Sequence, residues 1–330
     1  MSRIEALPGL DPAAYRNHAL HGAGIDWVEK NCYADLWVEF LHTLGLEPRA
    51  MLPFTVAIDF EGDQWTFFKP PLAELRDLYG IDVQELTVWK PLIEHVAQHL
   101  EAGKLISTET DAFWLPDTAG TDYRLKHTKT TIMVASLDVQ ERKLGYFHNA
   151  GYHELNGEDF VKVFRLDMPH DPAYMPQFAE MIRIDRMVHR GEEELAAMSM
   201  NLLRRHFAWR PATNPFTRFA MSMMRDLPVI SEAGMEHYHL WAFATIRQAG
   251  AAYELLAQGL RWLGAQGLGD FSEAAARFES ISRANTALIL KGARAAHTGR
   301  ALDVARLVTS MEKDWDEGMA LIAKQLSSRA

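Results

Sequence analysis

The sequence predicts an α+β domain over residues 1–168, followed by an all-α helical bundle domain over residues 169–330. Strand-like runs lie only in the first part, whereas apolar residues at helical spacing dominate the second. Pro169 and Pro172 separate the two patterns. A chain of 330 residues also exceeds most single hydrophobic cores, so two domains are expected.

In the first part, a helix is expected within residues 25–45 that begins near Asn31 and Cys32, because apolar residues follow at helical spacing. Gly45 and Pro48 are expected to end it. Strands are predicted at residues 54–60 and 65–68 around the acidic turn 61–63, helices at 70–80 and 87–102, and a strand at 105–108.

The clearest β signal is a hairpin. Residues 127–136 are rich in Thr, Ile and Val, residues 138–142 form a polar turn, and residues 144–148 are apolar again. If the turn is centred near Asp138, His127 and Asn149 lie almost opposite each other and share a face of the sheet. A register shift of one residue would put His148 in the place of Asn149.

The second part is predicted to be helical, since its apolar residues recur at i, i+3 and i+4 and Gly or Pro separates the segments. The helices are expected at residues 174–190, 192–207, 231–263, 271–296 and 302–326.

The composition excludes several classes of protein. A formal net charge of −10 disfavours nucleic acid as a partner. A single cysteine permits neither an internal disulfide nor a thiolate metal cluster, and no metal is expected. The sequence has no apolar signal core and no run of about 18 apolar residues, so a cytoplasmic protein without membrane contact is expected. P-loop, GxGxxG and GxSxG motifs are absent.

Cys32 is the candidate nucleophile. A helix N-terminus and a neighbouring imidazolium both stabilise a thiolate, and Cys32 is expected in the first turn of an apolar helix. His127 is the candidate base, and the amide of Asn149 is expected to hold its ring. Each residue also has a structural interpretation: a lone cysteine is often a buried small hydrophobe, His127 suits a structural position on a strand, and Asn149 suits a plain turn.

Several strings resemble a bacterial family that is associated with amino acid:carrier-protein ligases and small carrier proteins. They are Asn31-Cys-Tyr-Ala-Asp-Leu-Trp37, Asp59-Phe-Glu-Gly-Asp-Gln-Trp-Thr-Phe-Phe-Lys-Pro70, Leu115-Pro-Asp-Thr118, His127-Thr-Lys-Thr130 and Tyr146-Phe-His-Asn149. The order of Cys, a strand-initial His and Asn at the end of the next strand resembles the papain-like (cysteine-protease-like) fold. It is distantly similar to the papain-like acyltransferase of butirosin biosynthesis, which moves an aminoacyl group from a carrier-protein thioester to an amine.

The resemblance implies a papain-like catalytic domain with Cys32 as nucleophile, His127 as base and Asn149 as the orienting residue. The implied donor is an aminoacyl or acyl group on the phosphopantetheine arm of a carrier protein, with no bound cofactor and with the ligase as a further partner. One residue departs from the pattern. Papain-like enzymes usually place Gln or Asn about six residues before the Cys to form the oxyanion hole, and here Asp26 stands there.

Further residues are expected to recognise the substrate and the carrier. Asp35, Asp111 and Asp117 are candidate partners of an aminoacyl ammonium group, and Asn31 is a candidate oxyanion donor. Five arginines form a candidate docking surface for an acidic carrier protein, although such a cluster is also typical of a solvated face: Arg204, Arg205, Arg210, Arg218 and Arg225. Two other functions are compatible with the same sequence features: a cysteine hydrolase (thioesterase, amidase or peptidase), and a non-catalytic adaptor that binds the carrier protein.

Overall fold

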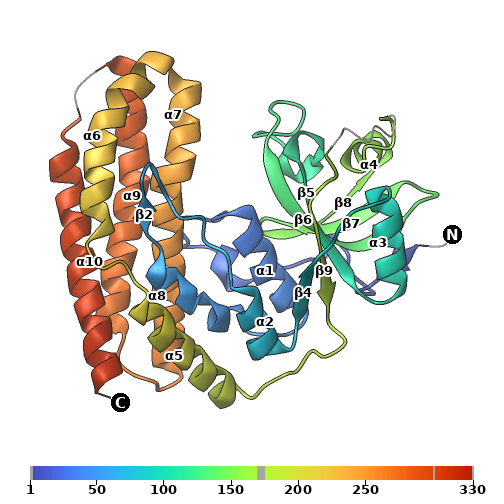
Figure 1. Ribbon diagram of the computed structural model, residues 1–330, viewed down its shortest axis with the longest axis horizontal. Helices are drawn as coiled ribbons and strands as arrows, with labels where there is room; N and C mark the ends of the chain where they lie inside the picture. Colours follow the sequence, from blue (N-terminus) through green and yellow to red (C-terminus); the bar gives the residue numbers. More distant parts are fainter. Residues whose placement is uncertain (1–2, 169–174, 300–301, 329–330) are drawn as a thin grey trace. The chain divides into compact units, whose positions relative to one another are not determined.

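The computed structural model describes residues 3–168, 175–299 and 302–328 (Figure 1). The chain forms two units, each built from three separate segments. Unit 1 consists of Met1–His21, Cys32–Glu47 and Leu72–His189. Unit 2 consists of Gly22–Asn31, Pro48–Pro71 and Arg190–Ala330. Within the described residues, no helix combines the length and the apolar character that crossing a bilayer requires.

Unit 1 is built around an antiparallel seven-stranded sheet in the order β4-β9-β5-β6-β7-β8, with β1 pairing β6. The α+β class predicted for this part of the chain is therefore confirmed. The strands are β1 (Ile4–Glu5), β4 (Asp82–Glu85), β5 (Leu105–Asp111), β6 (Lys129–Asp138), β7 (Lys143–His148), β8 (Gly151–Asn156) and β9 (Ala179–Arg183).

The predicted hairpin is confirmed as β6 and β7, but the predicted opposition of His127 and Asn149 is wrong. Strand β6 begins only at Lys129, and a bulge between Val134 and Ser136 shifts the register. His148 pairs with Gly151 of β8, so Asn149 lies in the tight connection between β7 and β8. Its φ of 46° is in the left-handed region, which Asn tolerates better than most residues.

Helices cover both faces of this sheet (Figure 1). Helices α3 and α4 pack on one face through an apolar core that includes Ile106, Val134 and Tyr146. Helix α1 lies on the other face, where the Phe40 ring meets the Phe147 ring at 5.9 Å between centroids. The helices of unit 1 are η1 (Ala19–His21), α1 (Cys32–Thr43), α2 (Leu72–Tyr79), α3 (Leu92–Glu101), η3 (Ala112–Trp114), η4 (Pro116–Thr118) and α4 (Gly157–Val163).

Unit 2 is a helical bundle that also incorporates two earlier segments of the chain. Trp65 lies in an aromatic core with Phe216 at 4.9 Å and Tyr253 at 5.9 Å between ring centroids. Its elements are η2 (Pro48–Ala57), β2 (Phe60–Glu61), β3 (Gln64–Trp65), α5 (Glu192–Ala208), α6 (Pro215–Ala233), α7 (Met235–Ala242), η5 (Phe243–Arg247), α8 (Gln248–Ala265), α9 (Ser272–Thr298) and α10 (Val304–Ser327).

Several predicted elements differ from the structure. Residues 54–60, predicted as a strand, lie mostly in the 3-10 helix η2, which accommodates Pro53. The helix predicted over residues 174–190 is wrong, because β9 lies within that range and pairs with β4 and β5. The single helix predicted over residues 231–263 is divided among the end of α6, α7, η5 and α8. Pro228, which precedes that predicted helix, lies inside α6. The predicted start of the helix at Cys32 is confirmed.

The predicted boundary at residue 168 falls before β9, which is still part of the sheet of unit 1. Pro169, Pro172 and the first residue of the predicted 174–190 helix lie outside the described residues.

Candidate functional site

The His127 ring is hydrogen-bonded to the carboxylate of Asp111 and stacks on the ring of Phe113. Its Nδ1 lies 2.6 Å from Oδ2 of Asp111, the last residue of β5. The other oxygen of Asp111 accepts hydrogen bonds from the backbone N–H groups of Phe113 at 3.1 Å and Thr128 at 3.2 Å. The Phe113 ring stacks on the imidazole at 4.3 Å between centroids and 13° between planes. Both the carboxylate and the ring are therefore fixed in orientation.

This arrangement leaves the second nitrogen of His127 accessible. A neutral ring that donates its Nδ1–H to Asp111 carries its lone pair on Nε2. Among the residues that the structure describes, none is hydrogen-bonded to Nε2, and the side chain is 70% exposed. A carboxylate on Nδ1 and a free Nε2 are the geometry that a general base requires.

Cys32 is the first residue of α1 and is partly buried. The hydroxyl of the next residue, Tyr33, donates to Glu180 of β9 at 3.0 Å. Glu180 is paired with Ser107 of β5, and side chains alternate along a regular strand, so Ser107 and Asp111 share one face. The helix that begins at Cys32 and the Asp111 carboxylate therefore lie over the same face of the sheet.

The structure does not join all three residues of the expected triad. Cys32 and His127 lie in the same unit, but within the described chain the thiol and the ring are not hydrogen-bonded to each other. Asn149 is in the β7–β8 turn, and the carboxylate that is hydrogen-bonded to His127 belongs to Asp111. The sequence alone suggests a role in substrate binding for Asp111, because the pairing of β5 with β6 that brings it to His127 is not visible in either strand alone.

His148 belongs to a second, buried network. Its Nδ1 lies 2.5 Å from Asp117 Oδ2 and its Nε2 lies 2.7 Å from the Thr130 hydroxyl. The Tyr146 hydroxyl donates to Asp117 Oδ1 at 2.5 Å. Burial raises the pKa of the Asp117 carboxyl, but the hydrogen bond and charge of His148, the charge of His153 and the Tyr146 hydroxyl outweigh it and hold the pKa below its usual value. Both oxygens of Asp117 are thus hydrogen-bonded within the protein.

Asp35 also has a partner within the protein. It is fully buried in α1, and its Oδ1 lies 2.9 Å from Nε2 of the buried His21. Nδ1 of the same ring is hydrogen-bonded to Glu39, one turn further along α1. Burial of a helix that is apolar on most of its surface forces these two carboxylates inside, where a charged group needs a partner. Two acidic residues in an otherwise apolar helix are the signal in the sequence that a buried partner such as His21 is needed.

Asn31 and Asp26 both have structural partners in unit 2. The Asn31 side-chain amide donates to the Phe68 carbonyl oxygen at 2.9 Å. The backbone N–H of Asp26 donates to Glu254 at 2.7 Å, and burial raises the pKa of that glutamate. Asn31 is buried.

The five arginines of the expected docking surface are Arg204, Arg205, Arg210, Arg218 and Arg225, all of them in or beside α5 and α6. Arg218 forms an ion pair with Asp59, and Arg225 forms one with Asp226. Arg204 donates to the Leu326 carbonyl oxygen, and Arg210 lies over the Phe207 ring. At least four of the five guanidinium groups therefore already have a partner inside unit 2.

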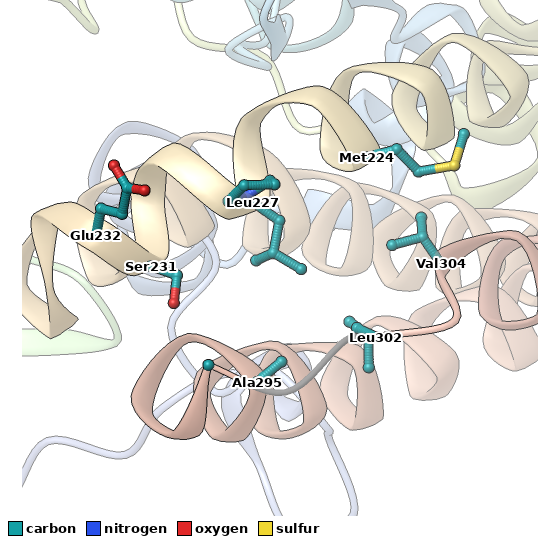
Figure 2. A pocket seen from close by; sticks show the side chains of 9 residues that line it. Met224, Leu227, Ser231, Glu232, Ala295, Leu302 and Val304 are labelled. Carbon is teal, nitrogen blue, oxygen red and sulfur yellow. The ribbon is translucent and has the colours of Figure 1, made fainter.

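The bundle contains a cavity of about 500 Å³ (Figure 2). Met224, Leu227, Ser231 and Glu232 of α6 line one side of it, and Ala295, Leu302 and Val304 line the other. None of the expected catalytic residues contributes to it. Among the described residues, no group of three or more His, Cys, Asp or Glu side chains is arranged to hold a metal ion.

Comparison with known proteins identifies the family. The DUF1839 N-terminal domain matches residues 16–184, and the DUF1839 C-terminal domain matches residues 192–324. A comparison with curated proteins gives no match. The two family matches cover nearly the whole chain, and the protein therefore belongs to the DUF1839 family.

Proposed function

We propose that this protein is a cysteine-dependent acyltransferase that uses Cys32 as nucleophile and His127 as base, with Asp111 as the residue that orients His127. The observation that carries the proposal is the His127–Asp111 pair, in which Nδ1 is bound to a fixed carboxylate and Nε2 is accessible. The start of α1 at Cys32 supports it, because backbone N–H groups at a helix N-terminus stabilise a thiolate.

The proposed donor is an aminoacyl or acyl thioester on the phosphopantetheine arm of a carrier protein. The Cys32 thiolate attacks the thioester carbonyl carbon, a bond forms to Sγ, and the bond to the pantetheine sulfur breaks. The departing thiolate takes the proton that His127 holds. An acceptor amine then attacks the acyl-enzyme, Nε2 of His127 accepts its proton, and Cys32 leaves as thiolate. The first step exchanges one thioester for another, and the second forms the more stable amide.

A papain-like fold for unit 1 belongs to the same proposal. In its favour are a helix that begins at the cysteine, an antiparallel sheet beneath it and a histidine just before a strand. The orienting residue differs from the papain-like order, because Asp111 precedes His127 in the chain instead of following it on the next strand. No aminoacyl-binding carboxylate is proposed, since Asp35, Asp111 and Asp117 all have protein partners.

Two observations favour other functions. The exposure of the His127 ring would admit water as the acceptor, which favours a hydrolase that uses the same residues. The missing thiol–imidazole hydrogen bond favours a non-catalytic adaptor, although such contacts are often long in proteins without substrate.

Alkylation of Cys32 tests the thiolate. We expect iodoacetamide at pH 7 to modify Cys32 faster than a free cysteine thiol, and His127→Ala to slow the reaction about tenfold or more. His99→Ala, on α3 in the same unit, serves as the matched control and should leave the rate unchanged. Equal rates in the wild-type protein and His127→Ala would reject the pair and favour the adaptor. Because the chain has one cysteine, the total adduct mass reports on this thiol alone.

Acyl transfer is tested by intact mass spectrometry. The protein is incubated with an aminoacylated carrier protein, and we expect the mass of one aminoacyl group on Cys32 that is absent from Cys32→Ser. Addition of an amine should release it as an amide. Release at the same rate without an amine would instead identify a hydrolase.

A further inference from the structure

The C-terminal part of α9 carries positive charge, and the acidic residue of the helix that is nearest to it, Glu279, forms an ion pair with Arg261 of α8. From residue 280 to the end of the helix at Thr298 there is no Asp or Glu, whereas Arg283, Lys291 and Arg294 are all present and exposed. None of these three side chains forms an ion pair with any residue that the structure describes.

These cations share one face of the helix with an exposed leucine. Positions i, i+4, i+7, i+8 and i+11 fall on the same side of an α-helix, about 16 Å from end to end. Leu290 is 69% exposed in the middle of this run. We call this set the α9 basic face, and it consists of Arg283, Ala287, Leu290, Lys291 and Arg294.

Such a face is unusual in a chain with a formal net charge of −10. It contrasts with the arginines near α5 and α6, where Asp59 and Asp226 already neutralise Arg218 and Arg225. The dipole of α9 accounts for a cation in its last turn, and thus for Arg294. It does not account for Arg283, which lies about four turns before the end, nor for an exposed Leu290.

We propose that the α9 basic face is the docking surface for an acidic protein helix, whose carboxylates pair with the three cations and whose apolar residue packs on Leu290. Paired charges around one apolar contact are typical of recognition between proteins, where complementary charge sets register and association rate. An anionic membrane is a poorer match, because interfacial helices present a broad apolar face and here only Ala287 and Leu290 are apolar.

The identity of the partner rests on the proposed function. If the acyl donor is a carrier protein, an acidic helical protein must bind before transfer, and the α9 basic face provides the matching charge. The docking itself does not depend on Cys32, so its failure and the failure of the catalytic proposal are distinguishable.

Binding of a bacterial holo-acyl carrier protein to the full chain tests the proposal, with the Cys32→Ala variant measured in parallel. We expect saturable binding in about 50 mM salt that weakens steeply as salt is raised. Arg283→Glu, Lys291→Glu and Arg294→Glu together should weaken it about tenfold or more. The matched control reverses three exposed cations on α10, Arg306, Lys313 and Lys324, where Glu312, Asp316 and Glu317 balance the charge. That control should change the affinity less than about twofold.

Three results would overturn the docking surface. They are no saturable binding at low salt, an equal loss of affinity in the α10 control, and stronger binding to phosphatidylglycerol vesicles that is lost in the α9 variant. Circular dichroism and the thermal midpoint of each variant should match the wild type, because all six positions are exposed. Binding by Cys32→Ala together with no acyl adduct on wild-type Cys32 would leave the docking surface standing and reject the transferase.

Discussion

Asp111 is the residue on which the candidate site depends most. Its Oδ1 is held by two backbone N–H groups and its Oδ2 by the ring of His127, so the carboxylate has one orientation. In hydrolases with a comparable carboxylate–histidine pair, the carboxylate selects the ring tautomer that keeps Nε2 basic. An amide in its place can present its N–H₂ group to Nδ1 and stabilise the wrong tautomer.

We therefore expect Asp111→Asn to lower the rate of acyl transfer from Cys32 by roughly 10²–10⁴-fold with little change in stability. Single-turnover loss of the acyl-enzyme, followed by mass spectrometry, measures this rate. Glu109→Gln is the control, since Glu109 lies two residues earlier on the same strand and forms an exposed ion pair with Lys129. A rate for Asp111→Asn within about twofold of the control would assign the pair a structural role.

At the scale of elements, the segment from Asp111 to Thr118 joins the two networks of unit 1. It carries Asp111 and Phe113, which hold His127 on the face covered by α1. Six residues later, Asp117 is bonded to Tyr146 and His148 of β7, on the face covered by α3 and α4. The segment is thus anchored at both ends, and Asp117 anchors the end farther from His127.

This anchor is expected to be sensitive to acid. The pKa of Asp117 is lower in the folded protein than in an unfolded chain, where it is about 3.9. Its contribution to the free energy of unfolding is therefore complete above pH 4–5, roughly, and is lost as pH falls through the folded pKa. Asp117→Asn should be less stable than wild type at pH 7, and the difference should shrink toward pH 3. Urea unfolding at several pH values measures it, and a constant difference would contradict the linkage.

Elements with local determinants can be predicted from the sequence. The β6–β7 hairpin and the start of α1 at Cys32 follow from short-range patterns, and both are confirmed. Strand β9 was missed because its partners β4 and β5 lie about 70–100 residues earlier, so no neighbouring residue signals the pairing. For the same reason the sequence does not reveal Asp111 as the partner of His127, because the two residues meet only through the pairing of β5 with β6. Asn149 is the residue that the simple hairpin pattern places opposite His127.

At the scale of the whole molecule, the two units are interleaved along the chain. Segments Gly22–Asn31 and Pro48–Pro71 precede most of unit 1 in sequence but belong to unit 2. Each brings a tryptophan into the bundle. The Trp27 indole N–H donates to Ser282 at 2.9 Å, and Trp65 packs against Phe216 and Tyr253. A predicted division into an N-terminal and a C-terminal half describes the secondary structure well, but it does not describe these segments.

We accordingly expect residues 190–330 to be unstable when they are produced alone. Loss of the buried Trp27 and Trp65 exposes apolar surface in the bundle. Truncation of a large buried aromatic side chain lowers the free energy of unfolding by about 3–5 kcal/mol. The fragment should bind the dye ANS and unfold at a lower temperature than the full chain. Calorimetry of the fragment and of the intact protein tests this, and an unchanged cooperative transition in the fragment would show that the bundle does not need these segments.

Interleaving also constrains how such a protein can evolve. The DUF1839 N-terminal match, residues 16–184, includes both of the segments that complete unit 2. A recombination event that exchanged the C-terminal match for an unrelated domain would leave Trp27 and Trp65 without their neighbours in the bundle. Unit 1 would then keep two inserted segments that have no bundle to pack against. The two matches should therefore be inherited together, and genomes that encode one without the other should be rare.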